Sequence, residues 1–326
     1  MRVLKCAVIG VGYLGRFHAQ KYKLLPDAEL VAVCDANPAT CEAVASELEV
    51  SACHNYRELF GKVEAVSIAA TTNQHYEIAK EFLKQGIHVL IEKPITETVE
   101  QADELIQLAA YHRAKIQVGH LERFNSARMA LDEYLDNPLF IESQRLAPFN
   151  LRGTDVNVIL DVMIHDIDII QSIVSSPIIH IDAQGAPVLS RSADIANSID
   201  IANARITFAN QCVANVTASR ISFKTERKTR IFQQDSYLSI DYHNKQFAVF
   251  KKGDGEMFPG IPNIVRHESV FEKSDALLEE IKAFVYCVLN DTKPLVCGQQ
   301  GRDVLSTAAT ITSLIQNNLA SRHAHI

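Results

Sequence analysis

The feature that most constrains this chain is the glycine-rich run GVGYLG at residues 10–15, directly after the apolar stretch VLKCAVI. Gly10, Gly12 and Gly15 have G-x-G-x-x-G spacing, and Asp35 ends the next apolar stretch, twenty residues beyond Gly15. A lone match is weak evidence, but a match between a strand and a helix, with an acid at this distance, is strong. The run predicts a strand–turn–helix that binds a dinucleotide. The alternative is a glycine-rich turn without a ligand.

Each residue of this motif has a physical task in binding a dinucleotide. Gly10 permits the tight turn, Gly12 lets the backbone approach the pyrophosphate, and Gly15 lets the helix pack closely on the strand. The free N–H groups and partial positive charge at the helix N-terminus favour the phosphates. The Asp35 carboxylate can accept hydrogen bonds from both ribose hydroxyls and would repel a 2′-phosphate, for which the following residues, ANP, offer no arginine. The motif therefore favours NAD over NADP.

Hydrophobic periodicity predicts two domains. Over residues 3–120, five short β-branched runs alternate with four amphipathic helical patterns, which is typical of a parallel sheet covered by helices on both faces. After residue 122 one helix and one strand are followed by the helix at 159–170 and then by six successive strand patterns, which favour an antiparallel sheet. We therefore predict an α/β chain with a doubly wound Rossmann domain at 1–121 and an α+β domain at 122–326.

The end of the second domain is predicted from turn residues and helical periodicity. The segment KKGDGEMFPGIPN at 251–263 is rich in Gly and Pro and is predicted to be a loop. Two helical patterns close the chain, one at 275–290 and one at 301–318.

Composition excludes several classes of function. With 326 residues, 47% of them hydrophobic, and a formal net charge of −7, the chain has material for a large core and lacks the basic charge of a nucleic-acid binder. The seven cysteines are scattered and contain no C-x-x-C, which favours reduced thiols over a disulfide framework or a metal site. The chain has no apolar run of 18 residues, and its N-terminus resembles a first strand rather than a signal peptide. We expect a cytoplasmic protein that binds neither nucleic acid nor membrane.

The run HVLIEKP places Glu92, Lys93 and Pro94 at the end of a predicted strand of the parallel sheet. The carboxyl ends of such strands face the ligand crevice. A lysine there can hydrogen-bond a substrate hydroxyl and stabilise the developing alkoxide. The alternative is an ordinary surface lysine at a strand end.

The run ILDVMIHDIDII at 159–170 is a mostly apolar helical pattern with a titratable stripe. Asp161, His165 and Asp168 fall at i, i+4 and i+7, so they lie on one face of a helix, whereas Asp166 points elsewhere. Buried carboxylates need partners or a wet cavity. Either these groups are satisfied within the core, or they face a site in which His165 accepts a substrate proton while Asp161 orients it. Asp168 can be purely structural.

Over nearly the whole chain, the sequence resembles the glucose-fructose oxidoreductase, inositol dehydrogenase and rhizopine-catabolism family. The resemblance is carried by GVGYLGRFHA, Asp35, EKP, GHLERFN, D-x-x-x-H-D-I-D and KPLVCGQQGRDVLSTAATI. The resemblance implies a large open, mostly antiparallel sheet in the second domain, which commonly joins subunits into dimers or tetramers. It also implies that Lys93, Asp161 and His165 are catalytic. Thr71 stands where the family often has Pro. The residues expected at the cofactor are Gly10, Gly12, Tyr13, Leu14, Gly15, Asp35, Thr71, Asn73, His75, Glu92 and Lys93.

Within the family, the stretch PFNLRGTDVNVILDVMIHDIDII is most similar to nucleotide-sugar members. Asn157 and Met163 stand where many sugar-oxidising members have Gly. This similarity implies oxidation of the C3 hydroxyl of UDP-N-acetylglucosamine, on the route to the diamino sugar of lipid A. A diphosphate requires cations. The expected substrate residues are Arg123, Arg152, Asp161, His165 and Arg220, with the KTERKTR cluster at 224–230 as a further candidate. Alternatively, Arg152, Arg220 and the cluster are solvated surface charges, and Arg123 packs in the linker between the domains.

Two other functions remain open at the level of sequence. One is a dehydrogenase of a free cyclitol or small polyol, which would need no diphosphate-binding cations. The other is a sensor that binds NAD and a protein partner without catalysis. Lys93, Asp161 and His165 argue against the sensor, because a sensor has no need of a proton relay.

Overall fold

The computed structural model describes residues 2–149, 156–189, 198–271 and 274–323. The chain divides into two compact units. Unit 1 comprises Met1–Phe124 and Asp275–Leu305, and unit 2 comprises Asn125–Ser274 and Ser306–Ile326. The chain first passes from unit 1 to unit 2 between Phe124 and Asn125, close to the predicted boundary at 121/122. The segment Asp275–Leu305, however, was predicted to belong to the second domain and packs with the first.

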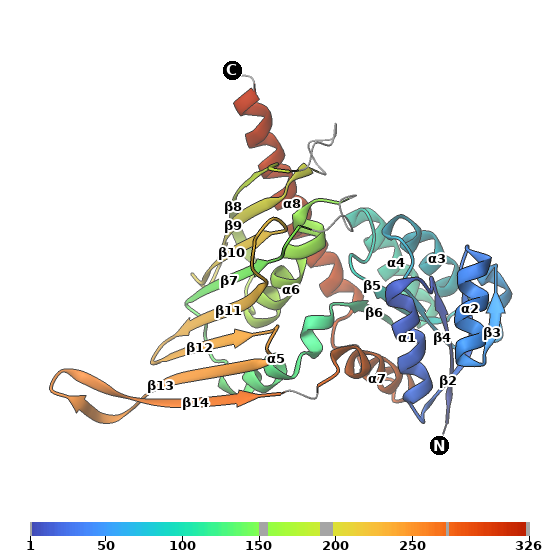
Figure 1. The fold of residues 1–326 in the computed structure, drawn as a ribbon, viewed down its shortest axis with the longest axis horizontal. Helices are drawn as coiled ribbons and strands as arrows, with labels where there is room; N and C mark the ends of the chain where they lie inside the picture. Colours follow the sequence, from blue (N-terminus) through green and yellow to red (C-terminus); the bar gives the residue numbers. More distant parts are fainter. Residues whose placement is uncertain (1, 150–155, 190–197, 272–273, 324–326) are drawn as a thin grey trace. The chain divides into compact units, whose positions relative to one another are not determined.

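Unit 1 contains the predicted parallel sheet, in the order β3-β2-β1-β4-β5-β6 (Figure 1). Its strands all pair parallel with their neighbours. They are β1 (Leu4–Ile9), β2 (Ala28–Cys34), β3 (Ser51–Cys53), β4 (Ala65–Ile68), β5 (His88–Glu92) and β6 (Ile116–Gly119). The strand order reverses between β1 and β4, which is where open α/β sheets bind their ligands.

Local capping signals mark the starts of two of the four helices that lie along the first 124 residues. These helices are α1 (Tyr13–Leu24), α2 (Pro38–Leu48), α3 (Thr72–Lys84) and α4 (Val99–His112). The Asn37 side chain accepts hydrogen bonds from the first turn of α2, which begins with Pro38. Thr98 and Gln101 form a capping box at the start of α4.

Helix α7 (Ala276–Leu289) explains why the end of the chain returns to unit 1. Its Ile281 and Phe284 are fully buried in the same core cluster as Leu4 of β1 and Tyr22 of α1. Burial of large apolar side chains contributes about 1.5–3 kcal/mol each. The apolar face of α7 is visible in the sequence, but nothing in the sequence says which sheet it covers.

Unit 2 contains an eight-stranded sheet in the order β14-β13-β12-β11-β7-β10-β9-β8 (Figure 1). Among the described strand pairs, β7 and β10 are parallel and the others antiparallel, so the predicted fold class is confirmed. The strands are β7 (Phe140–Leu146), β8 (Ile178–Ala186), β9 (Ile201–Phe208), β10 (Val213–Ser219), β11 (Glu226–Gln233), β12 (Ser236–Asp241), β13 (Gln246–Phe258) and β14 (Ile261–Val270).

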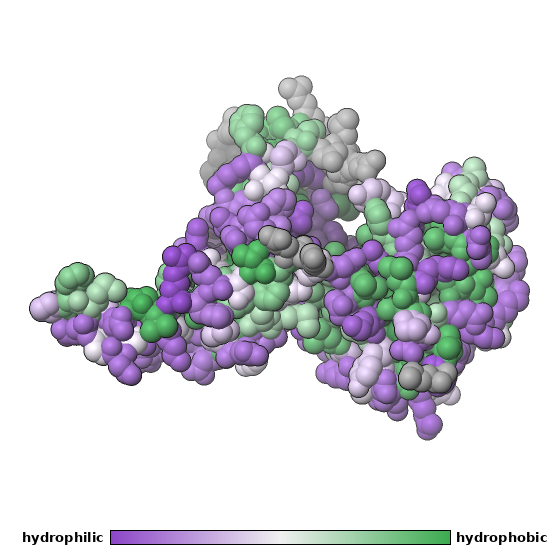
Figure 2. All heavy atoms as spheres, turned by 60° about the horizontal axis from the view of Figure 1, so that its bottom comes forward, coloured by the Kyte–Doolittle hydropathy of each residue, from purple (hydrophilic) through white to green (hydrophobic). Residues whose placement is uncertain are grey.

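The prediction of a loop at 251–263 is wrong, because this segment extends β13 and β14 into a long hairpin (Figure 1). Gly255 and Gly260 have φ of 76° and 79°, and the strand register shifts nearby, so the glycines are used in bulges and a turn within a ladder. The hairpin exposes hydrophobic residues, as Figure 2 shows on its surface. They are Met257, Phe258, Ile261, Ile264 and Val265.

The remaining helices are α5 (Ser126–Ala130), α6 (Ile164–Ile173) and α8 (Gly298–His323). Helix α5 continues as a 3₁₀ turn, Leu131–Tyr134, so the predicted helix at 126–136 is divided between two geometries. Helix α8 begins in unit 1 and ends in unit 2. In the described part of the chain no helix is both long and apolar enough to cross a membrane.

Candidate functional site

The glycine turn has the geometry that its spacing predicts. Gly10 has φ of +81°, and a Cβ there would lie 2.7 Å from the Ala70 backbone. A Cβ on Gly15 would lie 1.7 Å from the Gly10 carbonyl oxygen, so α1 can approach β1 this closely only without a side chain. A Cβ on Gly12, in contrast, would meet nothing within 4 Å. The space beside Gly12 is therefore open to a ligand.

A cavity of about 580 Å³ lies at this turn, within unit 1. Four predicted cofactor residues line it: Gly10, Gly12, Asp35 and Thr71. The sequence argument missed another part of the wall, residues 54–57 (His54, Asn55, Tyr56 and Arg57). This segment follows β3, whose three residues are too few to show a strand pattern. The position of the cavity beyond the carboxyl ends of β1, β2 and β4 fits a bound dinucleotide.

The Asp35 carboxylate is fixed at the end of β2 by two backbone groups. Its Oδ2 accepts from the Val11 N–H at 2.8 Å, and its Oδ1 accepts from the Asn37 N–H at 2.8 Å. Each carboxylate oxygen has a further lone pair for a ribose hydroxyl. Arg57, a cation in the same cavity, lies 3.6 Å from the Glu81 carboxylate and stacks over Tyr56.

We predict that Gly12→Ala and Gly15→Ala separate ligand binding from folding. The new methyl at position 12 points into open space, so the fold remains intact while the methyl obstructs the pyrophosphate, and NAD affinity falls at least tenfold. At position 15 the methyl meets a backbone oxygen, so the thermal midpoint falls by several degrees, about the shift expected of a destabilisation of 1–3 kcal/mol. Calorimetric titration with NAD and thermal melts distinguish the two effects. Unchanged NAD affinity in Gly12→Ala would mean that the pyrophosphate does not lie beside this residue.

Two residues predicted to contact the cofactor, Glu92 and His75, have buried side chains. Glu92 is 8% exposed, and its carboxylate Oε1 lies 3.0 Å from the His18 ring. His75 is 1% exposed and contacts backbone carbonyl oxygens. Neither side chain lines this cavity, so whether either one contacts the cofactor remains a prediction.

The other predicted cofactor residues lie at helix starts or at a strand end. Tyr13 and Leu14 are 74% and 37% exposed at the first turn of α1. The Thr71 hydroxyl, at the start of α3, donates to the Asn73 side chain at 2.6 Å. Lys93 is half-buried and directly follows β5, and its backbone N–H donates to its neighbour's carboxylate at 3.2 Å. Whether these side chains contact the cofactor remains a prediction.

The helix predicted at 159–170 is not uniform. Residues Ile159–Met163 form a π-helical turn, in which the Ile164 N–H bonds to the Ile159 carbonyl five residues back, and α6 begins only at Ile164. Asp161 lies in the wide turn and His165 in the first turn of α6, and both are half-buried. The simple i, i+4 geometry predicted for this pair is therefore wrong in detail. Single π turns occur frequently at functional sites.

The two other aspartates of this helix are buried within unit 2. Asp166 is 0% exposed, and its carboxylate accepts from the Arg145 Nε at 2.8 Å and from the Ser143 hydroxyl at 2.9 Å. Asp166 thus points to the sheet strand β7. Asp168 is 1% exposed, and its structural role remains a prediction. These contacts fix how α6 is rotated on the sheet, and therefore which way His165 faces.

The structure gives Arg220 a task other than substrate binding. Its Nε donates to Asp200 at 2.9 Å and its Nη1 to the Val156 carbonyl at 2.6 Å, and the side chain is nearly buried. We therefore correct its assignment as a diphosphate ligand, and it is not a solvated charge either. Arg123 is half-buried in the 3₁₀ turn Leu121–Phe124 and stays a prediction, while Arg152 lies outside the described residues.

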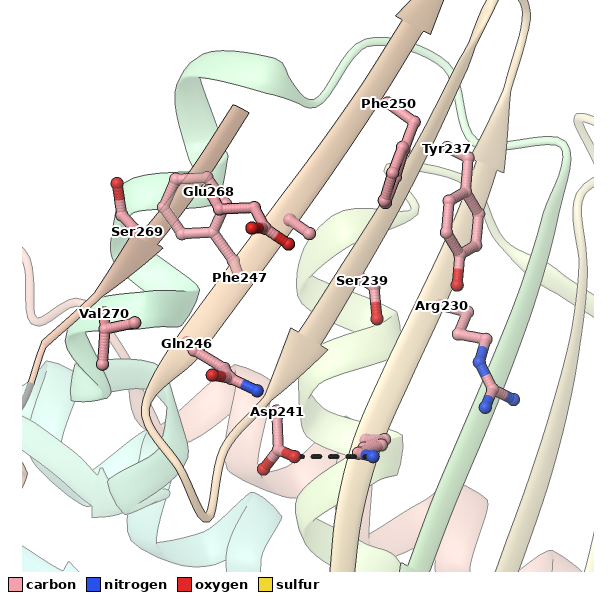
Figure 3. A pocket seen from close by; sticks show the side chains of 12 residues that line it. Arg230, Tyr237, Ser239, Asp241, Gln246, Phe247, Phe250, Glu268, Ser269 and Val270 are labelled. Atoms are coloured by element: carbon pink, nitrogen blue, oxygen red, sulfur yellow. Dashed lines mark ion pairs between the residues drawn. The ribbon is translucent and has the colours of Figure 1, made fainter. Parts of the chain in front are cut away.

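The KTERKTR cluster lies on the eight-stranded sheet and does not form a free cationic patch. Lys228 lies 3.6 Å from the Asp241 carboxylate, and Arg230 lies 3.6 Å from the Glu142 carboxylate. Both side chains line a cavity of about 400 Å³ on the face of strands β11–β14. Figure 3 shows Tyr237 and Phe250 projecting beside Arg230 from adjacent strands. This face carries aromatic and charged side chains. Unlike the dinucleotide cavity, it includes no part of the glycine turn.

Comparisons with known proteins agree with this geometry. The oxidoreductase family with an NAD-binding Rossmann fold matches residues 4–120. A UDP-N-acetylglucosamine 3-dehydrogenase of Acidithiobacillus ferrooxidans is 37% identical over 316 residues, which cover 96% of this chain and 97% of the relative. A solved structure of that enzyme has a TM-score of 0.90 at 35% identity and covers 97% of this chain and 99% of its own. A myo-inositol 2-dehydrogenase of Thermotoga maritima is 25% identical, with 93% of each chain covered.

Proposed function

The chain belongs to the oxidoreductase family with an NAD-binding Rossmann fold, and on this premise we propose that it oxidises the C3 hydroxyl of UDP-N-acetylglucosamine with NAD. The observation that carries this proposal is the 37% identity to a UDP-N-acetylglucosamine 3-dehydrogenase over 97% of the length of that enzyme. The inositol dehydrogenase is less similar, at 25% identity, which favours the nucleotide sugar over the free cyclitol.

The proposed chemistry assigns each catalytic side chain one task. NAD, which Gly10, Gly12 and Asp35 would hold, would supply the acceptor for the hydride of C3. His165 takes the proton from the C3 hydroxyl, so that the C–H and O–H bonds become a C=O bond with release of one proton. Asp161 orients the imidazole or the adjacent hydroxyl, and Lys93 polarises the hydroxyl and relays the proton. Arg123 and Arg152 remain proposed substrate contacts. The resulting ketone is the group that an aminotransferase requires, as in the route to the diamino sugar of lipid A.

A substrate panel tests this proposal. Purified protein with NAD and UDP-N-acetylglucosamine should form NADH, which is followed by its absorbance. UDP-glucose, UDP-N-acetylgalactosamine and free myo-inositol should give at least tenfold lower kcat/KM, because each lacks or displaces a group that the site must recognise. Activity with myo-inositol alone would replace the nucleotide-sugar proposal with the cyclitol alternative. NAD binding without turnover of any sugar would favour the sensor.

We also propose that the protein acts as a cytoplasmic homodimer or homotetramer joined through the eight-stranded sheet. Phe232 of β11 is 37% exposed, and its ring lies beside that of Tyr237 on β12, so this part of the sheet exposes aromatic surface. The β13–β14 hairpin adds further exposed apolar residues, and a two-stranded ribbon alone is only marginally stable in water. All seven cysteines are free thiols, which supports a reducing compartment.

A further inference from the structure

His75 is a buried titratable residue to which the proposed chemistry assigns no role. It lies in the first turns of α3, is 1% exposed, and has both ring nitrogens against backbone carbonyls. Its Nδ1 lies 2.9 Å from the Pro94 oxygen, and its Nε2 lies 3.0 Å from the Ala70 oxygen. Carbonyl oxygens only accept hydrogen bonds, so each contact is a hydrogen bond when the nitrogen facing it carries a proton.

The two carbonyls belong to two different parts of the site. Ala70 lines the 580 Å³ cavity just beyond β4, and Pro94 directly follows Lys93 beyond β5. Strands β4 and β5 are neighbours in the sheet, but their following segments have no ladder to hold them together. The imidazole therefore joins the wall of the dinucleotide cavity to the segment that carries Lys93.

A second buried histidine, His18, contacts Glu92, the residue that precedes Lys93 in the chain. The Glu92 carboxylate accepts from the Lys93 N–H at 3.2 Å through Oε2, while its Oε1 lies 3.0 Å from the His18 ring. This inward conformation requires Gly119 on β6, because a Cβ there would lie 2.9 Å from the Glu92 Cδ. The backbone on both sides of Lys93 is thus fixed by buried polar contacts.

We propose that His75 is a positioning residue for Lys93. Through its contacts with the Ala70 and Pro94 carbonyls, the His75 ring couples the dinucleotide cavity to the catalytic lysine. The inference rests on the proposed function, because it takes Lys93 as a catalytic group. Loss of the imidazole removes the ring that lies between these two buried carbonyl oxygens, together with the hydrogen bond that its N–H donates, and frees the segment 93–96 to shift. A displacement of about 1 Å can lower a rate by roughly 100-fold.

The test compares His75→Leu and His75→Gln with His88→Gln as a matched control. His88 is also a partly buried histidine of this unit, but it lies at the opposite end of β5 and accepts from the Lys115 N–H at 3.0 Å. We expect His75→Leu to lower kcat at least tenfold with less than a threefold change in KM for NAD. His75→Gln should recover part of kcat, since its amide can donate to one carbonyl, and His88→Gln should retain wild-type kcat.

Amide hydrogen exchange of the peptide covering 92–98 gives a readout that does not depend on turnover. Exchange there should accelerate at least tenfold in His75→Leu and remain unchanged in His88→Gln, even if no sugar on the panel is a substrate. Unchanged exchange in both His75 variants, or equal acceleration in the control, would overturn the positioning role. If His75→Leu does not fold, the same comparison applies to His75→Gln. If exchange is faster in His75→Leu but the wild-type protein oxidises no sugar on the panel, the positioning role is retained and the proposed substrate is rejected.

Discussion

Replacing His165 with Asn is expected to lower kcat by roughly 10²–10⁴-fold, the usual contribution of a general base. Asparagine keeps a polar side chain of similar size but cannot take a proton at neutral pH. His165 is half-buried at the start of α6, so the thermal midpoint should change little. NAD affinity should also remain unchanged, because the residues lining the dinucleotide cavity all belong to unit 1. Steady-state kinetics, calorimetric titration and thermal melts together give these three quantities.

The control for this substitution is His180→Asn, on the exposed side of β8 in the same unit. The same chemical change there should leave kcat unaltered. If His165→Asn retains kcat within threefold of wild type, His165 is not the base, and Lys93 becomes the group to examine.

Removing the Asp166 carboxylate is expected to cause the largest loss of stability, about 3–5 kcal/mol of unfolding free energy in Asp166→Ala. The partner, Arg145, has a 5% exposed side chain, and its guanidinium lies over the Tyr242 ring. Without Asp166 this cation stays buried but loses its ion pair with the carboxylate. Urea denaturation at equilibrium measures the loss. Asp166→Asn, which keeps the shape and one acceptor oxygen, should lose less.

Glu142→Ala supplies the matched control on the same strand, β7. Glu142 pairs with Arg230 at 3.6 Å, but both side chains are more than a third exposed. Solvent screens such a pair, so its loss should cost about 1 kcal/mol or less. Equal losses in Asp166→Ala and Glu142→Ala would show that burial does not set the value of the Asp166–Arg145 pair.

Signals within a few residues of each other made much of the fold predictable from sequence. The glycine motif and the alternation of short apolar runs with amphipathic helical patterns act over short stretches of chain, and the structure contains the strand–turn–helix and the parallel sheet that they predict. The dinucleotide cavity was predictable for the same reason, because Gly10, Gly12 and Asp35 meet wherever a strand–turn–helix lies beside a second parallel strand.

Features that depend on distant partners could not be predicted. Glu92 turns inward because Gly119, 27 residues later, leaves room for its carboxylate, and no local pattern records this. Helix α7 shows an apolar face without identifying the sheet that it covers. The π turn at Ile159–Met163 has the composition of an ordinary helix. The Gly-rich segment of β13 was assigned to a loop because glycines used in bulges resemble glycines used in loops.

The most direct test of the proposed reaction follows the hydrogen at C3. UDP-N-acetylglucosamine carrying deuterium only at C3 is incubated with the protein and NAD, and the reduced cofactor is analysed by mass spectrometry. The proposed function predicts reduced NAD that is heavier by one deuterium, formed with a slower rate than from the unlabelled sugar if hydride transfer limits turnover. Reduced NAD of ordinary mass, with the label retained in the sugar, would contradict oxidation at C3.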